Sequence, residues 1–190
     1  TNGTGDPEEY TLEELKKFRL KMPDGTLTDE SIATFEDALN LVRGKAMVDI
    51  DIKTSHLKPV ADVIKKTNTL EQVFWFDNDY DALKEVLSIE ENSMLMPRAY
   101  SFEMADSALK VFSPNVIHID PSFYTKEVTE LIRGGNARIW INALGETDDL
   151  IRKGETESAM NDLLKFKANV IQTDEPEKIL KYLDSKGLRN

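Results

Sequence analysis

Acidic, basic, aromatic and amide side chains stand at the ends of two β-prone runs in this sequence. One run ends in Asp51 and Lys53, and another ends in Trp140 and Asn142. Residues two apart lie on one face of a strand, so the members of each pair point the same way. A carboxylate is an oxygen ligand for a hard divalent cation, and an ammonium offers a point charge to a phosphate. An indole can form the wall of a small-molecule site, and an amide can orient a hydroxyl group.

Each of these residues also has a purely structural interpretation. Asp51 could cap a loop or form a plain ion pair with Lys53, and Trp140 could pack in a core. Asp49 shares a face with Asp51, and we interpret it as an interior polar contact rather than a ligand. Trp75 has no comparable polar neighbours, so we predict that it lies in the core.

The chain has two histidines, the residue type that most often serves as a general acid or base near neutral pH. His118 lies in a β-prone run, near Asp120 by alternation, and we interpret it as an interior histidine with satisfied hydrogen bonds. His56 follows a turn at a helix start, and we expect it to be exposed. Neither histidine is predicted to be catalytic.

The acidic cluster Asp77-Asn78-Asp79-Tyr80-Asp81 resembles part of a calcium-binding loop. An EF-hand needs glycine at its sixth position and glutamate at its twelfth, where this chain has Ala82 and Ser88. We therefore expect Asp77 or Asn78 to cap the following helix instead.

Short β-prone runs alternate with helical patterns from residue 46 onward. The expected strands are 46–52, 72–76, 93–96, 115–119, 137–141 and 168–172. The expected helices are roughly 57–67, 79–90, 101–112, 124–134, 156–166 and 176–186. Such alternation predicts parallel strands joined by right-handed crossovers.

Two α/β architectures fit this alternation. An open doubly wound sheet usually has a glycine-rich first turn, and the sequence has neither a G-x-G-x-x-G motif nor a P-loop. A TIM (β/α)8 barrel instead collects polar residues at the C-terminal ends of its strands, as the strand ends do here. We therefore predict an α/β fold, a TIM barrel represented by about six C-terminal β/α units with the first two strands missing.

We predict one partial TIM-barrel domain over residues 1–190. Residues 1–45 would form the loop and helices that precede the third strand, and residues 46–190 the β/α units. The chain begins Thr1-Asn2-Gly3-Thr4-Gly5 without a methionine, and such turn residues are typical of loops. We therefore expect it to be a piece of a longer chain.

Within the N-terminal part, Thr11 to Glu14 resembles a capping box and predicts a helix over residues 8–21. Residues 22–31 contain proline, glycine and aspartates and are expected to form a loop or tight turn. Thr34 would cap a second short helix with acidic residues in its first turn.

Composition excludes several classes of function. The 190 residues carry 24 Lys and Arg against 35 Asp and Glu, a net charge of −11, and 40% are hydrophobic. Nucleic acid and anionic membrane surfaces require clustered basic residues and are therefore not expected as main partners. The absence of cysteine excludes disulfides, thiolate nucleophiles and cysteine-based zinc sites.

Five groups of residues, in order along the chain, resemble motifs of glycerophosphodiester phosphodiesterases. They are Thr1–Gly5 with Tyr10–Leu15, Ile32–Leu39, Ile50–Lys53, Trp140–Asn142 and Ile171–Pro176. The last three are similar to the family's third-strand Glu-x-Lys, seventh-strand Trp-x-Asn and eighth-strand Thr-Asp-x-Pro. The ending Leu180–Leu188 resembles a variant type from gut Gram-negative bacteria.

The resemblance implies a TIM-barrel phosphoric diester hydrolase of lipid metabolism. Such an enzyme hydrolyses glycerophosphodiesters to an alcohol and glycerol phosphate with a divalent cation, Ca²⁺ or Mg²⁺. The resemblance assigns Asp51 to the metal, although the family more often has Glu there, and Lys53, Trp140 and Asn142 to the substrate. The family's catalytic histidines lie in motifs that this chain lacks. We therefore expect no catalytic residue in it and no turnover by this chain alone.

The alternative is a non-catalytic binding module for a phosphorylated small molecule or a protein partner. A third interpretation is a barrel that processes sugars or acids with convergent strand-end acids. Two missing strands would expose parallel sheet edges, so we expect a dimer or a complementing N-terminal segment. We expect no membrane span, and the resemblance implies a periplasmic or secreted location.

Overall fold

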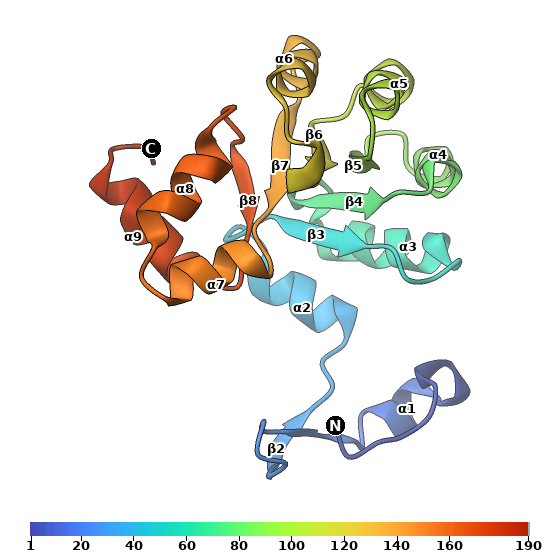
Figure 1. Cartoon of the computed structure of the whole chain (residues 1–190). Coiled ribbons are helices and arrows are strands. Elements are labelled where there is room, and N and C mark those ends of the chain that lie inside the picture. Colours follow the sequence, from blue (N-terminus) through green and yellow to red (C-terminus); the bar gives the residue numbers. More distant parts are fainter. Residues whose placement is uncertain (190) are drawn as a thin grey trace.

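The computed structural model describes residues 1–189, and its main feature is a curled, six-stranded parallel sheet (Figure 1). The strands are β3 Val48–Asp51, β4 Val73–Asp77, β5 Met94–Ala99, β6 Val116–Ile119, β7 Arg138–Asn142 and β8 Val170–Gln172. They lie side by side in chain order, which is the arrangement of a β/α barrel wall. The predicted fold class, a partial TIM barrel with six β/α units, is therefore confirmed.

Alternate residues of each strand face the surrounding helices. The parallel register places Trp75 beside Leu95 and Ile117 beside Ile139, and each of the four is at most 2% exposed. Removing such a side chain from water contributes about 1.5–3 kcal/mol, so this face supplies most of the driving force. The prediction that Trp75 lies in the core is confirmed.

The other face of the sheet is concave and has a smaller apolar cluster. Phe74, Met96 and Val116 are buried there, and Phe76 and Trp140 pack against them. These residues come from four different strands, so the curvature of the sheet brings them together. The concave face therefore has an apolar floor beneath the polar residues of the strand ends.

Helices cover the outer side of the curved sheet (Figure 1). They are α3 Leu57–Thr67, α4 Tyr80–Ile89, α5 Phe102–Phe112, α6 Lys126–Gly134, α7 Glu146–Arg152, α8 Thr156–Leu164 and α9 Pro176–Ser185. Within residues 1–189, no helix has the length and apolar character needed to cross a membrane.

The N-terminal cap of α4 differs from the expected one. The Asp79 carboxylate accepts hydrogen bonds from the backbone N–H groups of Asp81 and Ala82. Asp77, one of the two expected caps, instead accepts the N–H of Asp79 at 2.9 Å. The cap is therefore Asp79, one residue beyond Asn78. β4 extends to Asp77 and α4 begins at Tyr80, so Asn78 and Asp79 form the turn between them.

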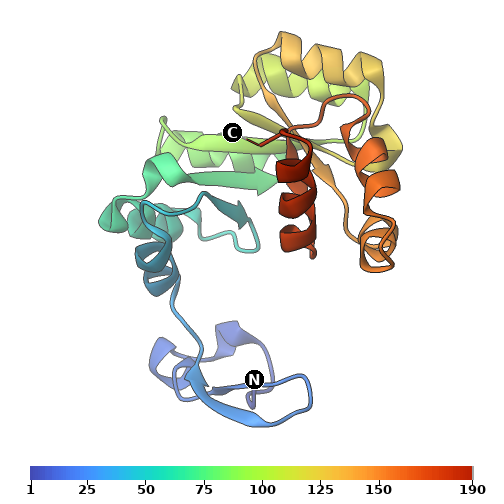
Figure 2. The same cartoon turned by 90° about the vertical axis from the view of Figure 1, so that its left-hand side faces the viewer.

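The N-terminal residues form an arm that projects away from the sheet (Figures 1 and 2). Its elements are a 3-10 turn Pro7–Glu9, α1 Leu12–Leu15, β1 Arg19–Lys21 and β2 Leu27–Ser31, and α2 Phe35–Val42 connects it to β3. The Thr34 hydroxyl accepts the N–H of Asp37, and the Asp37 carboxylate accepts the N–H of Thr34. This reciprocal pair confirms the predicted cap of the second helix.

The expected helix over residues 8–21 and the expected loop over 22–31 are wrong in part. The helix ends at Leu15, and β1 and β2 pair antiparallel as a hairpin. Gly25 lies in its turn at φ 89°, a left-handed conformation that glycine adopts without steric cost. The capping box at Thr11 predicts where the helix begins, but no apolar stripe sustains it.

Helix α7 was not among the expected helices, because it is short and acidic and begins without a side-chain cap. Its Asp148 is completely buried, and its carboxylate accepts the Thr173 hydroxyl at 2.6 Å and the backbone N–H of Asp174 at 2.7 Å. These two bonds tie the turn after β8 to the turn after β7. The six expected strands and the other helices of the β/α units are confirmed to within about three residues.

We predict that replacing Asp148 with alanine destabilises the fold. Two buried donors would lose their acceptor, so the free energy of unfolding should fall by about 2–3 kcal/mol in urea titrations. Asp149→Ala is the matched control, because Asp149 is 57% exposed and its one ion-pair partner among residues 1–189 is the exposed Arg152. That control should cost less than about 1 kcal/mol. Equal losses in the two variants would contradict the prediction.

Candidate functional site

The C-terminal ends of the parallel strands lie along one rim of the sheet, where Asp51 and Lys53 are found. Asp51 is the last residue of β3, and its register partner on β4 is Phe76. The Lys53 ammonium donates a hydrogen bond to the Asp51 carboxylate, and their side chains are 77% and 51% exposed. The structure thus shows the ion pair considered above, on a rim that a ligand can reach.

Asp49 lies on the same face as Asp51, and its register partner is the apolar Phe74. Desolvation against this face, together with the charge of Asp51, raises the pKa of Asp49 to about 6, while Lys53 acts in the opposite direction. Asp49 is exposed in the structure, so it is not the interior contact that was expected. Two carboxylates thus face the same region of the rim.

The carboxylates of Asp49 and Asp51 could supply oxygen ligands to a metal ion. Hard cations take six to eight oxygen ligands, and two carboxylates supply only part of such a set. In the part of the chain that the structure describes, no group of three or more His, Asp or Glu side chains could hold a metal ion. Asp51 fits as one oxygen ligand, and a complete site would need further ligands.

A second polar group on the rim consists of Arg98, His118 and Asp120, which we call the mouth cluster. Arg98 and His118 are register partners on β5 and β6. The Nη2 group of Arg98 donates to both oxygens of Asp120, at 2.7 and 2.8 Å. His118 Nε2 lies 4.0 Å from the nearer of these oxygens, which is beyond hydrogen-bonding distance. The sequence pattern placed His118 near Asp120, but the partnership of Asp120 with Arg98 was not expected.

His118 is buried at 4% exposure, and its ring lies 5.0 Å from that of Phe76 and 6.1 Å from that of Trp140. Within residues 1–189 neither ring nitrogen has a hydrogen-bond partner. The expectation of a satisfied interior histidine is therefore wrong, because Asp120 is already engaged by Arg98. Burial and the positive charge of Arg98 lower the pKa of His118 to about 4, and Asp120 opposes them.

The substrate residues expected on the seventh strand, Trp140 and Asn142, lie on β7 next to the mouth cluster. The Trp140 indole N–H donates to the Gln172 side chain at 3.3 Å, and its ring meets Phe74 edge-on at 5.8 Å. The Asn142 side-chain oxygen accepts the N–H of Leu144 at 2.7 Å. Trp140 is thus both a wall of the concave face and part of its packing.

The structure therefore separates the four expected site residues into two groups. Asp51 ends β3 and Lys53 follows it, while Trp140 and Asn142 stand four strands away on β7. The concave floor between them includes Phe74, which shares a register position with Asp49 and contacts Trp140. His56 is exposed, as expected, and its ring lies 3.3 Å from the Thr54 hydroxyl.

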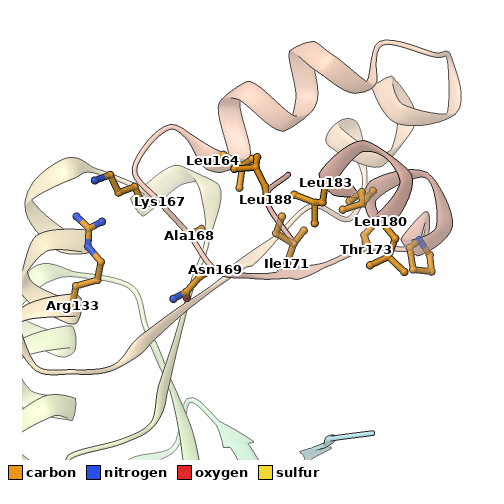
Figure 3. A pocket seen from close by; sticks show the side chains of 12 residues that line it. Arg133, Leu164, Lys167, Ala168, Asn169, Ile171, Thr173, Leu180, Leu183 and Leu188 are labelled. Atoms are coloured by element: carbon orange, nitrogen blue, oxygen red, sulfur yellow. The ribbon is translucent and has the colours of Figure 1, made fainter. Parts of the chain in front are cut away.

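The larger grooves lie away from most of these residues. A shallow groove of about 470 Å³ beside the ends of β3 and β4 is lined by Lys53, Asp77 and Asp79. A groove of about 710 Å³ runs along β8 and α9 and is lined by Ile171, Leu183 and other apolar side chains (Figure 3). The second groove contains none of the expected site residues, so its size alone does not make it the candidate site.

Comparisons of the structure find solved proteins with the same fold. A glycerophosphoryl diester phosphodiesterase from Parabacteroides distasonis has a TM-score of 0.80 and 24% identity, over 97% of this chain and 67% of that one. A glycerophosphodiester phosphodiesterase from Agrobacterium tumefaciens has a TM-score of 0.69 and 18% identity, over 95% and 75%. An Oleispira antarctica phosphodiesterase in complex with the product sn-glycerol-3-phosphate has a TM-score of 0.73 and 16% identity, over 96% and 74%.

The chain therefore has the fold of these phosphodiesterases and spans two thirds to three quarters of their length. Comparisons of the sequence find no matching family model and no matching curated protein. At these identities the likeness shows a shared fold, and the chemistry must be argued from the residues.

We predict that His118 makes the stability of the fold sensitive to acid. Between pH 6.5 and about 4 the unfolded chain binds a proton at this imidazole that the folded chain does not, so the contribution of His118 to stability falls as the pH is lowered. The raised pKa of Asp49 acts in the opposite direction below about pH 6, so the contribution of His118 is obtained by comparison with a variant that lacks the imidazole. The loss is at most about 1.4 kcal/mol per pH unit, and above pH 6.5 the contribution is fully present. Urea titrations over pH 4–8 measure it.

His118→Phe keeps an aromatic ring against Phe76 and removes the titrating group, so the stability of the wild type relative to this variant should fall as the pH is lowered over this interval. His56→Gln is the control, because His56 is exposed and its loss should leave the pH dependence unchanged. Parallel pH curves for the wild type and His118→Phe would contradict the prediction.

Proposed function

We propose that this chain forms the larger part of the barrel of a metal-dependent glycerophosphodiester phosphodiesterase. The parent activity is the hydrolysis of a glycerophosphodiester to an alcohol and glycerol phosphate. The observation that carries the proposal is the Asp51–Lys53 pair, which lies on the rim of a barrel wall shared with such enzymes. The motifs of the third, seventh and eighth strands support it, as does a neighbour of the same fold whose complex contains sn-glycerol-3-phosphate.

In this proposal the residues of the chain bind and orient the substrate. The exposed Lys53 ammonium donates hydrogen bonds to the non-bridging phosphoryl oxygens and offsets their charge. Trp140 provides an apolar wall for the alcohol, and the Asn142 amide nitrogen donates to one of its hydroxyl groups. Holding the diester at both ends fixes the position of the phosphorus, and such orientation lowers the barrier of a later bond cleavage.

A divalent cation, Ca²⁺ or Mg²⁺, would supply Lewis-acid polarisation of a phosphoryl oxygen. Asp51 is the residue we propose as its ligand, with further ligands from outside the described part of this chain. An aspartate is shorter than the glutamate usual in the resembling family, so it would hold the ion closer to β3. While Lys53 is paired with Asp51, the ion and the ammonium compete for the same carboxylate.

Neither histidine is suited to be the general acid or base of this reaction. His118 is buried and neutral at physiological pH, because its pKa is lowered to about 4, and His56 is exposed beside α3. The proposed catalytic histidines therefore belong to other segments of the parent, and we expect no turnover by this chain alone. The same observation favours the second candidate, a non-catalytic module that binds a phosphorylated small molecule or a protein partner.

Binding of sn-glycerol 3-phosphate to the chain tests the proposal. In calorimetric titrations we predict measurable binding to the wild type and a loss of about tenfold in affinity for Lys53→Met, because a charged hydrogen bond to phosphate disappears. No binding to the wild type, or equal binding to Lys53→Met, would refute the assignment.

Lys58→Met is the matched control for this measurement. Lys58 is an exposed lysine five residues away, and its ammonium pairs with Asp62 at 2.7 Å as Lys53 pairs with Asp51. The Lys58→Met substitution removes the same charge from a nearby part of the surface, at a position away from the rim. Its affinity should therefore stay close to that of the wild type.

We also propose that the free edges of the sheet are covered in solution by a second copy or by a complementing segment. Within the described residues, β3 and β8 each pair with one neighbour only. Unpaired parallel edges beside an apolar concave face favour association. Size-exclusion chromatography with light scattering should give twice the 21.6 kDa mass of the chain, or a larger complex with a co-purified segment. A monodisperse monomer would contradict this.

A further inference from the structure

The side chain of Gln172 connects the last strand of the sheet to the Trp140 indole. Gln172 ends β8, and its register partner on β7 is Asn142. Register partners on neighbouring strands point to the same face of a sheet, and so do residues two apart on one strand. Gln172, Asn142 and Trp140 therefore share the concave face, where Trp140 packs against Phe74.

The Trp140 indole is open to a ligand on part of its surface. Trp140, Asn142 and Gln172 are each partly exposed, while Ile141, which points to the opposite face, is buried. Packing against Phe74 covers one part of the indole, so a ligand can meet only the rest. Which part remains for the ligand depends on the orientation of the ring.

Two contacts set that orientation. The Trp140 ring meets the Phe74 ring edge-on, with the centroids 5.8 Å apart and the planes at 75°. The indole N–H donates to the side-chain oxygen of Gln172 at 3.3 Å. Apolar packing is non-directional, and the torsion that turns an indole about its attachment is broad and roughly two-fold. A hydrogen bond requires the donor to point at its acceptor, so Gln172 selects one orientation of the ring.

The backbone of Gln172 is itself held in place. Its carbonyl oxygen accepts the N–H of Ala143 at 2.9 Å. The next two residues are tied to the buried Asp148, whose carboxylate accepts the Thr173 hydroxyl at 2.6 Å and the N–H of Asp174 at 2.7 Å. Thr173 and Asp174 belong to the eighth-strand motif, so in this chain part of that motif fixes the position of the Gln172 acceptor.

We propose that Gln172 is a positioning residue, which holds the Trp140 indole in the orientation that borders the alcohol part of the substrate. This inference rests on the proposed function, in which Trp140 forms the wall for the alcohol and Lys53 binds the phosphate. Gln172 acts through the indole, so loss of its acceptor oxygen releases the ring and weakens binding of the substrate.

The hydrogen bond can be observed in the ligand-free chain, which has two tryptophans and two glutamines. Trp75 Nε1 has no hydrogen-bond partner among residues 1–189, so its indole proton should resonate upfield of that of Trp140. Trp140→Phe assigns the two signals. We expect a nuclear Overhauser effect between the Trp140 indole N–H and the Gln172 side-chain NH₂ group. Its absence would overturn the proposal.

Two substitutions of Gln172 separate its acceptor oxygen from its bulk. Gln172→Met has a side chain of similar length without the oxygen, so the Trp140 indole proton should move upfield. Gln172→Glu retains an acceptor oxygen and should keep the signal close to its wild-type position. An unchanged signal in Gln172→Met, or equal shifts in both variants, would count against positioning. If Gln172→Met does not fold, the Overhauser effect in the wild type and the Gln172→Glu spectrum still decide.

Gln72→Met is the matched control for these spectra. The Gln72 side chain donates to the carbonyl oxygen of Ala46 at 2.7 Å and accepts the N–H of Gly44 at 2.8 Å. It precedes β4, three strands away from Trp140. The control variant should lower the stability of the fold and leave the Trp140 signal unchanged. A shift like that of Gln172→Met would show general loosening instead of positioning.

Binding of sn-glycerol 3-phosphate tests the consequence for the substrate. Gln172→Met should bind it about fivefold more weakly than the wild type in calorimetry. In Trp140→Phe, which has no indole N–H, adding Gln172→Met should cause no further loss, because the two residues act as one unit. Independent, additive losses would contradict action through the indole.

Failure of this inference is distinguishable from failure of the proposed function. If sn-glycerol 3-phosphate does not bind to the wild type, the proposed function falls, and the role of Gln172 toward the substrate falls with it. If it binds in a Lys53-dependent way and Gln172→Met binds it as tightly as the wild type, the positioning role falls alone.

Discussion

Parallel pairing of six strands is the constraint on which the rest of this structure depends. Each strand must satisfy its backbone groups against its neighbours, and it must present alternate residues to the helices. Trp75, Leu95, Ile117 and Ile139 meet the second demand from four successive strands. The residues between them are forced onto the concave face, where their order is set by register. The rim is therefore a consequence of how the outer face is buried.

Two ion pairs stand at the rim of a chain that as a whole carries a net charge of −11. Lys53 pairs with Asp51, and Arg98 pairs with Asp120, so the rim presents two compensated pairs. The difference between them is burial. The first pair is open to water, while the second is more enclosed and lies beside His118, whose pKa is lowered to about 4 mainly by burial.

The shared fold and the residues of the candidate site support the proposed function to different degrees. Phosphodiesterases with the same arrangement of strands are at most 24% identical to this chain in the comparisons given above, and barrels of this kind support many chemistries. The proposed phosphodiester chemistry rests on the combination of a charged pair at the end of β3 with a wall and an amide on β7. In that proposal the substrate spans the concave face between the two groups.

The sequence by itself determined the alternation of strands and helices, the helix Leu57–Thr67 to the residue, the capping box at Thr11 and the helix cap at Thr34. These features depend on local periodicity and on contacts three residues apart. Only the tertiary structure decided that residues 19–31 form a hairpin, that Asp148 is a buried acceptor, and that Asp120 is bound by Arg98 rather than by His118. Those outcomes depend on partners 6 to 26 residues away in the chain, or on which of two neighbouring side chains binds one carboxylate. No local pattern encodes that competition, because it is settled by distance and burial after the strands have paired.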